Sequence, residues 1–139
     1  MTTRIRATIS EKSKYWIDKH RHYELKHFCL QYPTWKRTYT ILDEPYITSS
    51  VTDKMPSGNL PGDPTAKRAI TKMRLHERIE MIENVAREAD QQLYAYILKG
   101  VTEGLSYTYL KSRMNMPCGK DMYYDRYRKF FWLLNKARD

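Results

Sequence analysis

The residues whose types and spacing could do chemistry are concentrated in residues 104–139, GLSYTYLKSRMNMPCGKDMYYDRYRKFFWLLNKARD. One set recurs at the four-, three- and four-residue steps of a buried helical stripe: Tyr123, Tyr127, Phe130 and Leu134. Burying this stripe leaves a second set facing outward along the first half of the same helix: Lys120, Asp121, Tyr124, Asp125 and Arg128. Arginine can bond bidentately to guanine, lysine can reach a guanine or a phosphate, and a carboxylate can accept from cytosine N4. The pattern therefore predicts contacts to base edges in double-stranded DNA.

Other cations of the same segment are placed to contact the phosphate backbone. They are Lys111, Arg113, Arg126, Lys129, Lys136 and Arg138. Contacts of this kind do not depend on base sequence and supply most of the salt-sensitive affinity of a DNA-binding protein. The alternative is an ordinary charged face exposed to solvent.

These side chains need a helix-turn-helix to position them, and the capping and helix-breaking residues of the segment predict one. Ser106 is a natural cap for a short first helix. Asn115 tolerates the left-handed backbone that ends this helix, and Met116 can fill the core between the two helices. Proline and glycine in residues 117–119 make the turn. A second helix then runs over 120–138 and is the expected recognition helix.

The GLSY start, the NMPCG turn and the basic helix that follows resemble region four of sigma factors, and the C-terminal part of phage late-transcription regulators of the RinA and ArpU type. The resemblance covers residues 104–139 and implies a transcription regulator that binds near a promoter. The sequence departs from the sigma pattern at Lys120-Asp121, where sigma factors usually have a Thr-Val pair. The core-facing residue must therefore shift to Met122 or Tyr123. The chain also has no room for a promoter-melting domain, which argues against complete sigma activity.

Two further segments, YELKHFCLQYPTWK and DPTAKRAI, are similar to small proteins encoded in prophages and integrative elements of Gram-positive bacteria. The first belongs to a predicted N-terminal helical hairpin over residues 1–43. Its helices span about Ser13–Tyr32, ended by Pro33, and Thr34–Leu42, packed back on the first. Residues 44–62 are rich in Pro, Ser, Gly and Asp and predict a linker or loop.

The remainder, residues 63–139, is predicted to be a helical DNA-binding module. Asp63-Pro64 is a strong helix start, and the helix should run to about Asp90. Its apolar stripe changes face, from Ala66, Ala69, Ile70 and Met73 to Leu75, Ile79, Ile82, Ala86 and Ala89. We expect the first group to support the hairpin and the second to form the floor of the C-terminal module. After a bend at Asp90-Gln91, another helix should end near Gly104.

Composition agrees with an all-α fold and a polyanionic partner. The 139 residues carry a formal charge of +9, and residues 104–139 alone carry +5. The alternative is a basic protein kept soluble by its charge. The two cysteines are far apart, and no apolar run approaches the length of a signal peptide core or a membrane span. We therefore expect a cytoplasmic protein without membrane contact.

Enzymatic and metal functions are not indicated. The sequence has no Gly-rich phosphate loop, HExxH motif or Gly-x-Ser-x-Gly elbow. A cluster of possible zinc ligands occurs at His20, His22, His27 and Cys29, but residues two apart on a helix point in divergent directions. We expect no catalysis, no cofactor and no metal. Trp132 falls opposite the buried stripe of its helix, where we expect either the N-terminal hairpin or a second copy of the chain to cover it.

The sequence thus predicts a sequence-specific DNA-binding transcription regulator of a prophage or integrative element. Two alternatives stay open. One is a DNA-packaging or replication accessory protein that uses the same motif to mark a site. The other is a protein-interaction module whose basic helix binds an acidic partner such as RNA polymerase. Contact with RNA polymerase and formation of a homodimer are open in each case.

Overall fold

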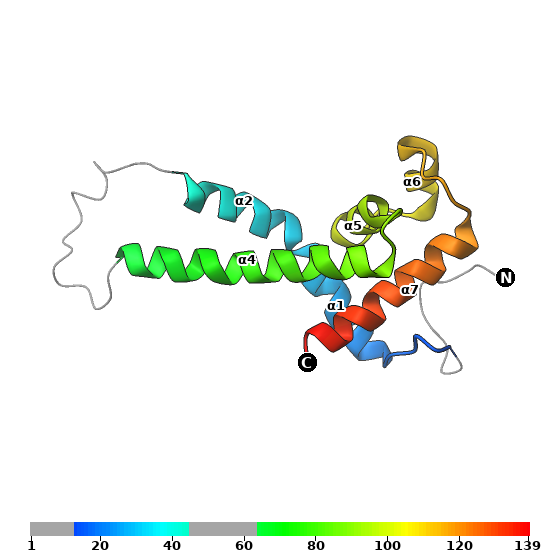
Figure 1. The fold of residues 1–139 in the computed structure, drawn as a ribbon, viewed down its shortest axis with the longest axis horizontal. Helices are drawn as coiled ribbons and strands as arrows, with labels where there is room; N and C mark the ends of the chain where they lie inside the picture. The colour runs from blue at the N-terminus through cyan, green and yellow to red at the C-terminus, as the bar shows by residue number, and fades with distance from the viewer. Residues whose placement is uncertain (1–12, 45–63) are drawn as a thin grey trace.

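The computed structural model describes residues 13–44 and 64–139, and all regular secondary structure within these ranges is helical (Figure 1). The helices are α1 (Lys19–Leu30), α2 (Tyr32–Asp43), α4 (Pro64–Ala89), α5 (Tyr94–Glu103), α6 (Tyr107–Met114) and α7 (Lys120–Ala137). The all-α prediction, the long central helix and the two C-terminal helices are confirmed. The predicted linker over 44–62 lies outside the described residues except for Glu44.

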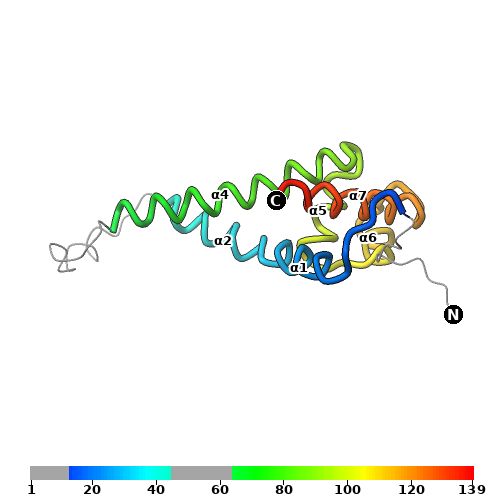
Figure 2. The backbone as a smooth tube through the Cα atoms, turned by 90° about the horizontal axis from the view of Figure 1, so that it is seen from below, coloured from blue at the N-terminus to red at the C-terminus, as the bar shows by residue number. Residues whose placement is uncertain are grey.

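The N-terminal helices form a bent helix, and the expected hairpin is wrong. The Asp18 carboxylate accepts hydrogen bonds from two backbone amides and so starts α1 at Lys19, later than the predicted Ser13. Gln31 separates α1 from α2 and keeps a right-handed helical backbone, so the chain bends without reversing. Pro33 lies in the first turn of α2, where a missing N–H costs nothing. Figures 1 and 2 show the result: α2 lies along α4, whereas α1 lies against α5 and α7.

The first half of α4 holds the end of α2 by polar contacts. The Arg68 guanidinium donates to the carbonyl oxygens of Ile41 and Leu42 at 3.2 and 3.3 Å. These are carbonyls that the end of a helix leaves without intrahelical partners. The Lys72 ammonium pairs with the Asp43 carboxylate. The predicted helix start at Asp63 lies outside the described residues, but the predicted end near Asp90 is confirmed by the last helical residue, Ala89.

Only one of the two predicted apolar stripes of α4 is buried. The residues Leu75, Ile79, Ile82, Ala86 and Ala89 are all in the core, as expected. Ala66, Ala69, Ile70 and Met73 are exposed, so the expectation that they support the N-terminal helices is wrong. The reason is rotational: Arg68 and Lys72 face α2, and the apolar group lies on the other side of the same helix turns.

The core of the described residues is one cluster to which every helix contributes. The most extensive helix contact joins α4 to α7, and α1 covers another flank of α7. The ring of His22 in α1 packs edge-on against Phe131 with centroids 4.9 Å apart. Burial, with a further contribution from the Lys26 charge, lowers the pKa of His22 to about 4. The imidazole is therefore neutral at physiological pH, which allows α1 to bury it against α7.

Two breaks in the chain set the direction of α5, and both match the sequence prediction. The Asp90 carboxylate accepts from the amides of Gln92 and Leu93 at 2.8 and 2.9 Å, which fixes the bend after α4. Gly104 has φ of 68°, a left-handed conformation that ends α5. Leu93, Ile97 and Val101 are buried, as the periodicity predicts.

Gly100 of α5 provides a test of the contact between α5 and α7. A Cβ built at this position would overlap the Tyr123 hydroxyl, which is buried and has no hydrogen-bond partner among the described residues. Gly100→Ala should lower the free energy of unfolding by about 1–3 kcal/mol because a rigid buried ring must move. In a Tyr123→Phe background the hydroxyl is gone, and the nearest ring carbon lies 3.5 Å from the added Cβ, which is an ordinary contact. There the same change should be neutral or stabilising, since alanine favours helix. Chemical denaturation of the four proteins measures this, and equal effects of Gly100→Ala in both backgrounds would contradict the packing.

Candidate nucleic-acid interface

The cap of α6 and the turn between α6 and α7 have the local geometry that the sequence predicts. The Ser106 hydroxyl accepts from the Tyr109 amide at 3.1 Å and caps α6. Asn115 has φ of 54° and ψ of 43°, the left-handed conformation that ends α6. Met116 is 1% exposed and so fills the core at the turn, as expected. Figure 1 shows the chain changing direction between α6 and α7.

Side chains of α6 fasten the turn to the first helix. The Lys111 ammonium donates to the carbonyl oxygens of Met116 at 3.0 Å and Cys118 at 3.4 Å. The Tyr107 hydroxyl donates to the same Cys118 carbonyl at 3.3 Å. Lys111 is exposed, but its charge is used to hold the turn. Its contact with a DNA phosphate stays a prediction. In that contact the ammonium would be shared between the phosphate and the two protein carbonyl oxygens.

The inward side of α7 is wider than the predicted stripe. Tyr123, Tyr127, Phe130 and Leu134 are all buried, as expected. Phe131 is also fully buried, which the sequence reasoning missed. Phe131 lies on the side of the stripe that meets His22 of α1. Helical periodicity could not identify this second neighbour, because it depends on where α1 is placed.

Of the five predicted base-contacting residues, those at the start of α7 are the most accessible. Lys120 and Asp121 are exposed, and Asp125 and Arg128 are partly exposed. By helical phase Lys120 points to the same side of α7 as the buried Tyr127 and Phe131, so its exposure comes from its place in the first turn, whereas Asp121 is on the opposite, outward side. The Asp125 carboxylate accepts a hydrogen bond from Arg126 of the same helix. The structure therefore brings these four side chains to one end of α7.

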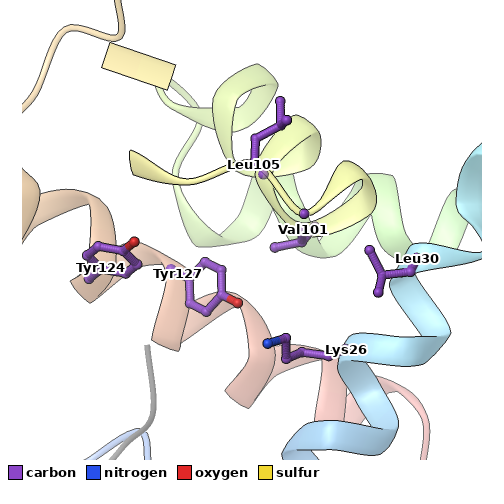
Figure 3. Close-up of a pocket in the computed structure, with 8 residues that line it drawn as sticks. Lys26, Leu30, Val101, Leu105, Tyr124 and Tyr127 are labelled. Atoms are coloured by element: carbon purple, nitrogen blue, oxygen red, sulfur yellow. The ribbon is translucent and has the colours of Figure 1, made fainter. Parts of the chain in front are cut away.

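Tyr124 differs from the other four. Its ring packs against Tyr123 and Tyr127, with centroids 5.1 and 5.7 Å apart. It borders a cavity of about 230 Å³ between α1, α5 and α7, into which the Lys26 amino group and the Tyr127 hydroxyl also point (Figure 3). Its predicted contact with a base stays untested, but the ring is turned toward the flank of α7 rather than directly outward.

Among the predicted phosphate contacts, Arg126 has a structural role. Its guanidinium donates to the Asp90 carboxylate at 2.9 Å and pairs with Asp125, so it ties α7 to the bend between α4 and α5. Burial opposes ionisation of Asp90, but hydrogen bonds from the Leu93 amide and the Arg126 guanidinium outweigh it and hold the pKa of this carboxyl below its usual range. A phosphate would have to compete with two carboxylates for Arg126.

The remaining predicted cations lie at the periphery of the helix-turn-helix. Arg113 is exposed on α6 and Lys129 is partly exposed on α7. The Arg138 guanidinium lies 3.9 Å from the centroid of the Phe28 ring, next to α1. The Lys136 ammonium lies 3.6 Å from the centroid of the Trp132 ring. Arg138 is therefore directed toward α1, whereas Lys136 stays on the outward face with Trp132.

Trp132 is covered by a residue that precedes α1. The Tyr15 ring lies against it, with centroids 5.6 Å apart and planes inclined at 58°. The sequence predicted a cover from the N-terminal helices or a second copy. The contact comes from the N-terminal part of the chain, but from the stretch before the first helix. The position of Trp132 opposite the stripe was the signal for this contact, whereas nothing in the sequence pointed to Tyr15.

The part of the chain that the structure describes shows neither a metal-binding cluster nor a helix that could span a membrane. In residues 13–44 and 64–139, no group of three or more His, Cys, Asp or Glu side chains could hold a metal ion. His22 and Cys29 are buried, whereas His20 and His27 are exposed. Within the same ranges, none of the helices combines the length and apolar character needed to cross a membrane.

Comparisons with protein-family models, curated proteins and solved structures found no significant match.

The Asp90 contacts predict a pH dependence of stability. A carboxyl whose pKa is lowered by folding contributes stability above its unfolded pKa of about 3.9, and this contribution is lost as the pH falls through the folded value. Asp90→Asn keeps a side-chain acceptor for the bend but removes the charge. The variant should therefore be less stable than the wild type at pH 6, and the difference should shrink below about pH 4. Urea unfolding from pH 2.5 to 7 measures it, and parallel curves for the two proteins would contradict the role of this ion pair.

Proposed function

We propose that this protein binds double-stranded DNA by inserting the first half of α7 into a major groove, and that it acts as a sequence-specific transcription regulator. The observation that carries the proposal is the division of α7 into two faces. Its aromatic face is buried against α4, α1 and α5, and the start of the helix presents Lys120, Asp121 and Arg128 on the outside. A recognition helix uses the N-terminal part of its exposed face in this way.

The charges around this end support contact with a polyanion. Within the described ranges, no carboxylate forms an ion pair with Lys120, Arg113 or Lys129. Three cations on α6 and α7 are thus available to phosphates on either side of a groove. In contrast, Lys99 and Lys72 of the other helices are paired with acidic neighbours. The net charge of +5 over residues 104–139 supports the same conclusion, although Arg126 in this segment is paired with Asp90 and Asp125.

The regulatory role is supported by the resemblance of residues 104–139 to sigma region four and to phage late-transcription regulators of the RinA and ArpU type. A DNA-packaging or replication accessory protein would use the same surface. Such a protein would differ in the genes near its binding site and in having no effect on transcription from them. A reporter gene placed downstream of the selected site separates these two roles.

A protein-interaction module, with α7 bound to an acidic partner such as RNA polymerase, is a different class of function. DNA binding predicts that log Kobs falls linearly with log salt, with a slope set by the number of phosphates contacted. An electrophoretic mobility shift with a random duplex library, repeated across salt concentrations, tests this directly. If the protein retains no duplex even at low salt, the DNA-binding proposal is wrong.

Two substitutions in α7 should have different effects on the selected duplex. Arg128→Ala should cost about 1–3 kcal/mol at one base-pair position and relax the preference there, because a bidentate contact to a base is lost. Lys136→Ala should weaken binding to all duplexes alike, because it removes a contact to the backbone. Lys67→Ala, at the far end of α4, is the matched control and should have neither effect. Titration of each variant against the selected site and all its single base-pair changes measures the difference. Unchanged binding by both α7 variants would show that another face binds DNA.

A further inference from the structure

We propose that Lys14 and Tyr15, which precede α1, combine with Trp132 and Lys136 of α7 to form a second DNA contact, directed at the phosphate backbone that borders the groove. The inference rests on the proposed function and extends it to a part of the chain far from the helix-turn-helix in sequence. The four side chains form one group, named here the ring cluster. Its centre is the contact between the Tyr15 and Trp132 rings.

The ring cluster places a cation on each of its two rings. The Lys136 ammonium lies 3.6 Å from the centroid of Trp132, and the Lys14 ammonium lies 5.0 Å from the centroid of Tyr15. Both distances are within the range of a cation–π interaction, for which the indole of tryptophan is the strongest partner. Neither lysine forms an ion pair with a carboxylate of the described residues. The rings therefore restrict two lysine side chains without neutralising their charge.

The chain before α1 is fixed well enough to position Tyr15. The Ser13 hydroxyl accepts from the Tyr15 amide at 3.1 Å, and the Ser13 carbonyl accepts from the Trp16 amide at 3.2 Å. Directly after this turn, Ile17 is 6% exposed and belongs to the core. Asp18 then caps α1. The Tyr15 ring thus lies against Trp132 between a hydrogen-bonded turn and a buried anchor.

The location of the ring cluster along α7 identifies the part of the duplex that it meets. Trp132 follows Asp121 by three helical turns and Asp125 by two, so all three side chains share one face. The rise of an α-helix puts Trp132 roughly 16 Å beyond Asp121 along the axis. The major groove of B-DNA is about 12 Å wide. When the start of α7 lies in the groove and its axis is directed toward a bordering strand, the ring cluster is therefore beyond the edge of the groove and next to the phosphates of that strand.

The size of the ring cluster also limits how α7 can dock. The Tyr15 ring, tilted against Trp132, adds bulk to the outward face of the second half of the helix, so this half cannot enter the groove as deeply as the first half. Base contacts are therefore restricted to the part of α7 before Trp132, and the cations of the ring cluster are left to the backbone. This arrangement also explains why an indole stands opposite the buried stripe of α7.

The test measures the salt dependence of DNA binding by the full chain. Lys14→Gln should reduce the slope of log Kobs against log salt by about 1, and it should do so equally for the selected duplex and for unrelated duplexes. Lys67→Gln is the matched control, because it removes the same charge from an exposed position at the far end of α4. Its slope should equal that of the wild type.

A second pair of variants tests whether the rings position the lysine. In a Trp132→Leu background, Lys14→Gln should cost a smaller factor in affinity than it does in the wild type, because Tyr15 has lost its support. An equal cost in the two backgrounds would overturn the ring cluster as a unit. If the wild type binds DNA but Lys14→Gln behaves like Lys67→Gln, this inference is wrong and the proposed function stands. If the wild type binds no duplex, the proposed function itself fails.

Discussion

The contact between α4 and α7 is the constraint on which the rest of the structure depends. α7 buries five aromatic or aliphatic side chains, and the second half of α4 supplies the largest surface against which they pack. Burial of large apolar side chains is the dominant favourable contribution to folding. Because a helix is rigid, fixing its inner face also fixes the direction of its outer face. The exposure of Asp121 is thus a consequence of packing on the other side of the same helix.

The two halves of α4 are used differently, and this explains the shape of the molecule. Its second half is apolar on the inside and joins the core with α1, α5 and α7. Its first half holds α2 by Arg68 and Lys72, and that pair of helices projects from the core (Figure 2). The bend at Gln31 makes this division feasible, because it lets one continuous N-terminal stretch contribute α1 and the start of α2 to the core and the rest of α2 to the projection.

Features that depend on neighbours in the chain were predictable from the sequence. The Ser106 cap, the left-handed Asn115, the buried Met116 and the bend at Asp90 each follow from the chemistry of one or two residues. Features that depend on packing between residues far apart in the sequence could not be predicted. Pro33 could end one helix or begin the next, and only the position of α2 against α4 decides between them. Likewise, the pairing of Arg126 with Asp90 and the cover that Tyr15 gives to Trp132 join residues whose proximity no local pattern indicates.

The uninterrupted length of α4 has a geometric consequence. Its 26 residues correspond to roughly 39 Å at the usual rise per residue. One turn of B-DNA measures about 34–36 Å. If the protein binds DNA as proposed and α4 lies along the duplex axis, the two ends of α4 would be separated by close to one helical repeat. A macromolecule held at its first turn would then face the same side of the DNA at the next groove.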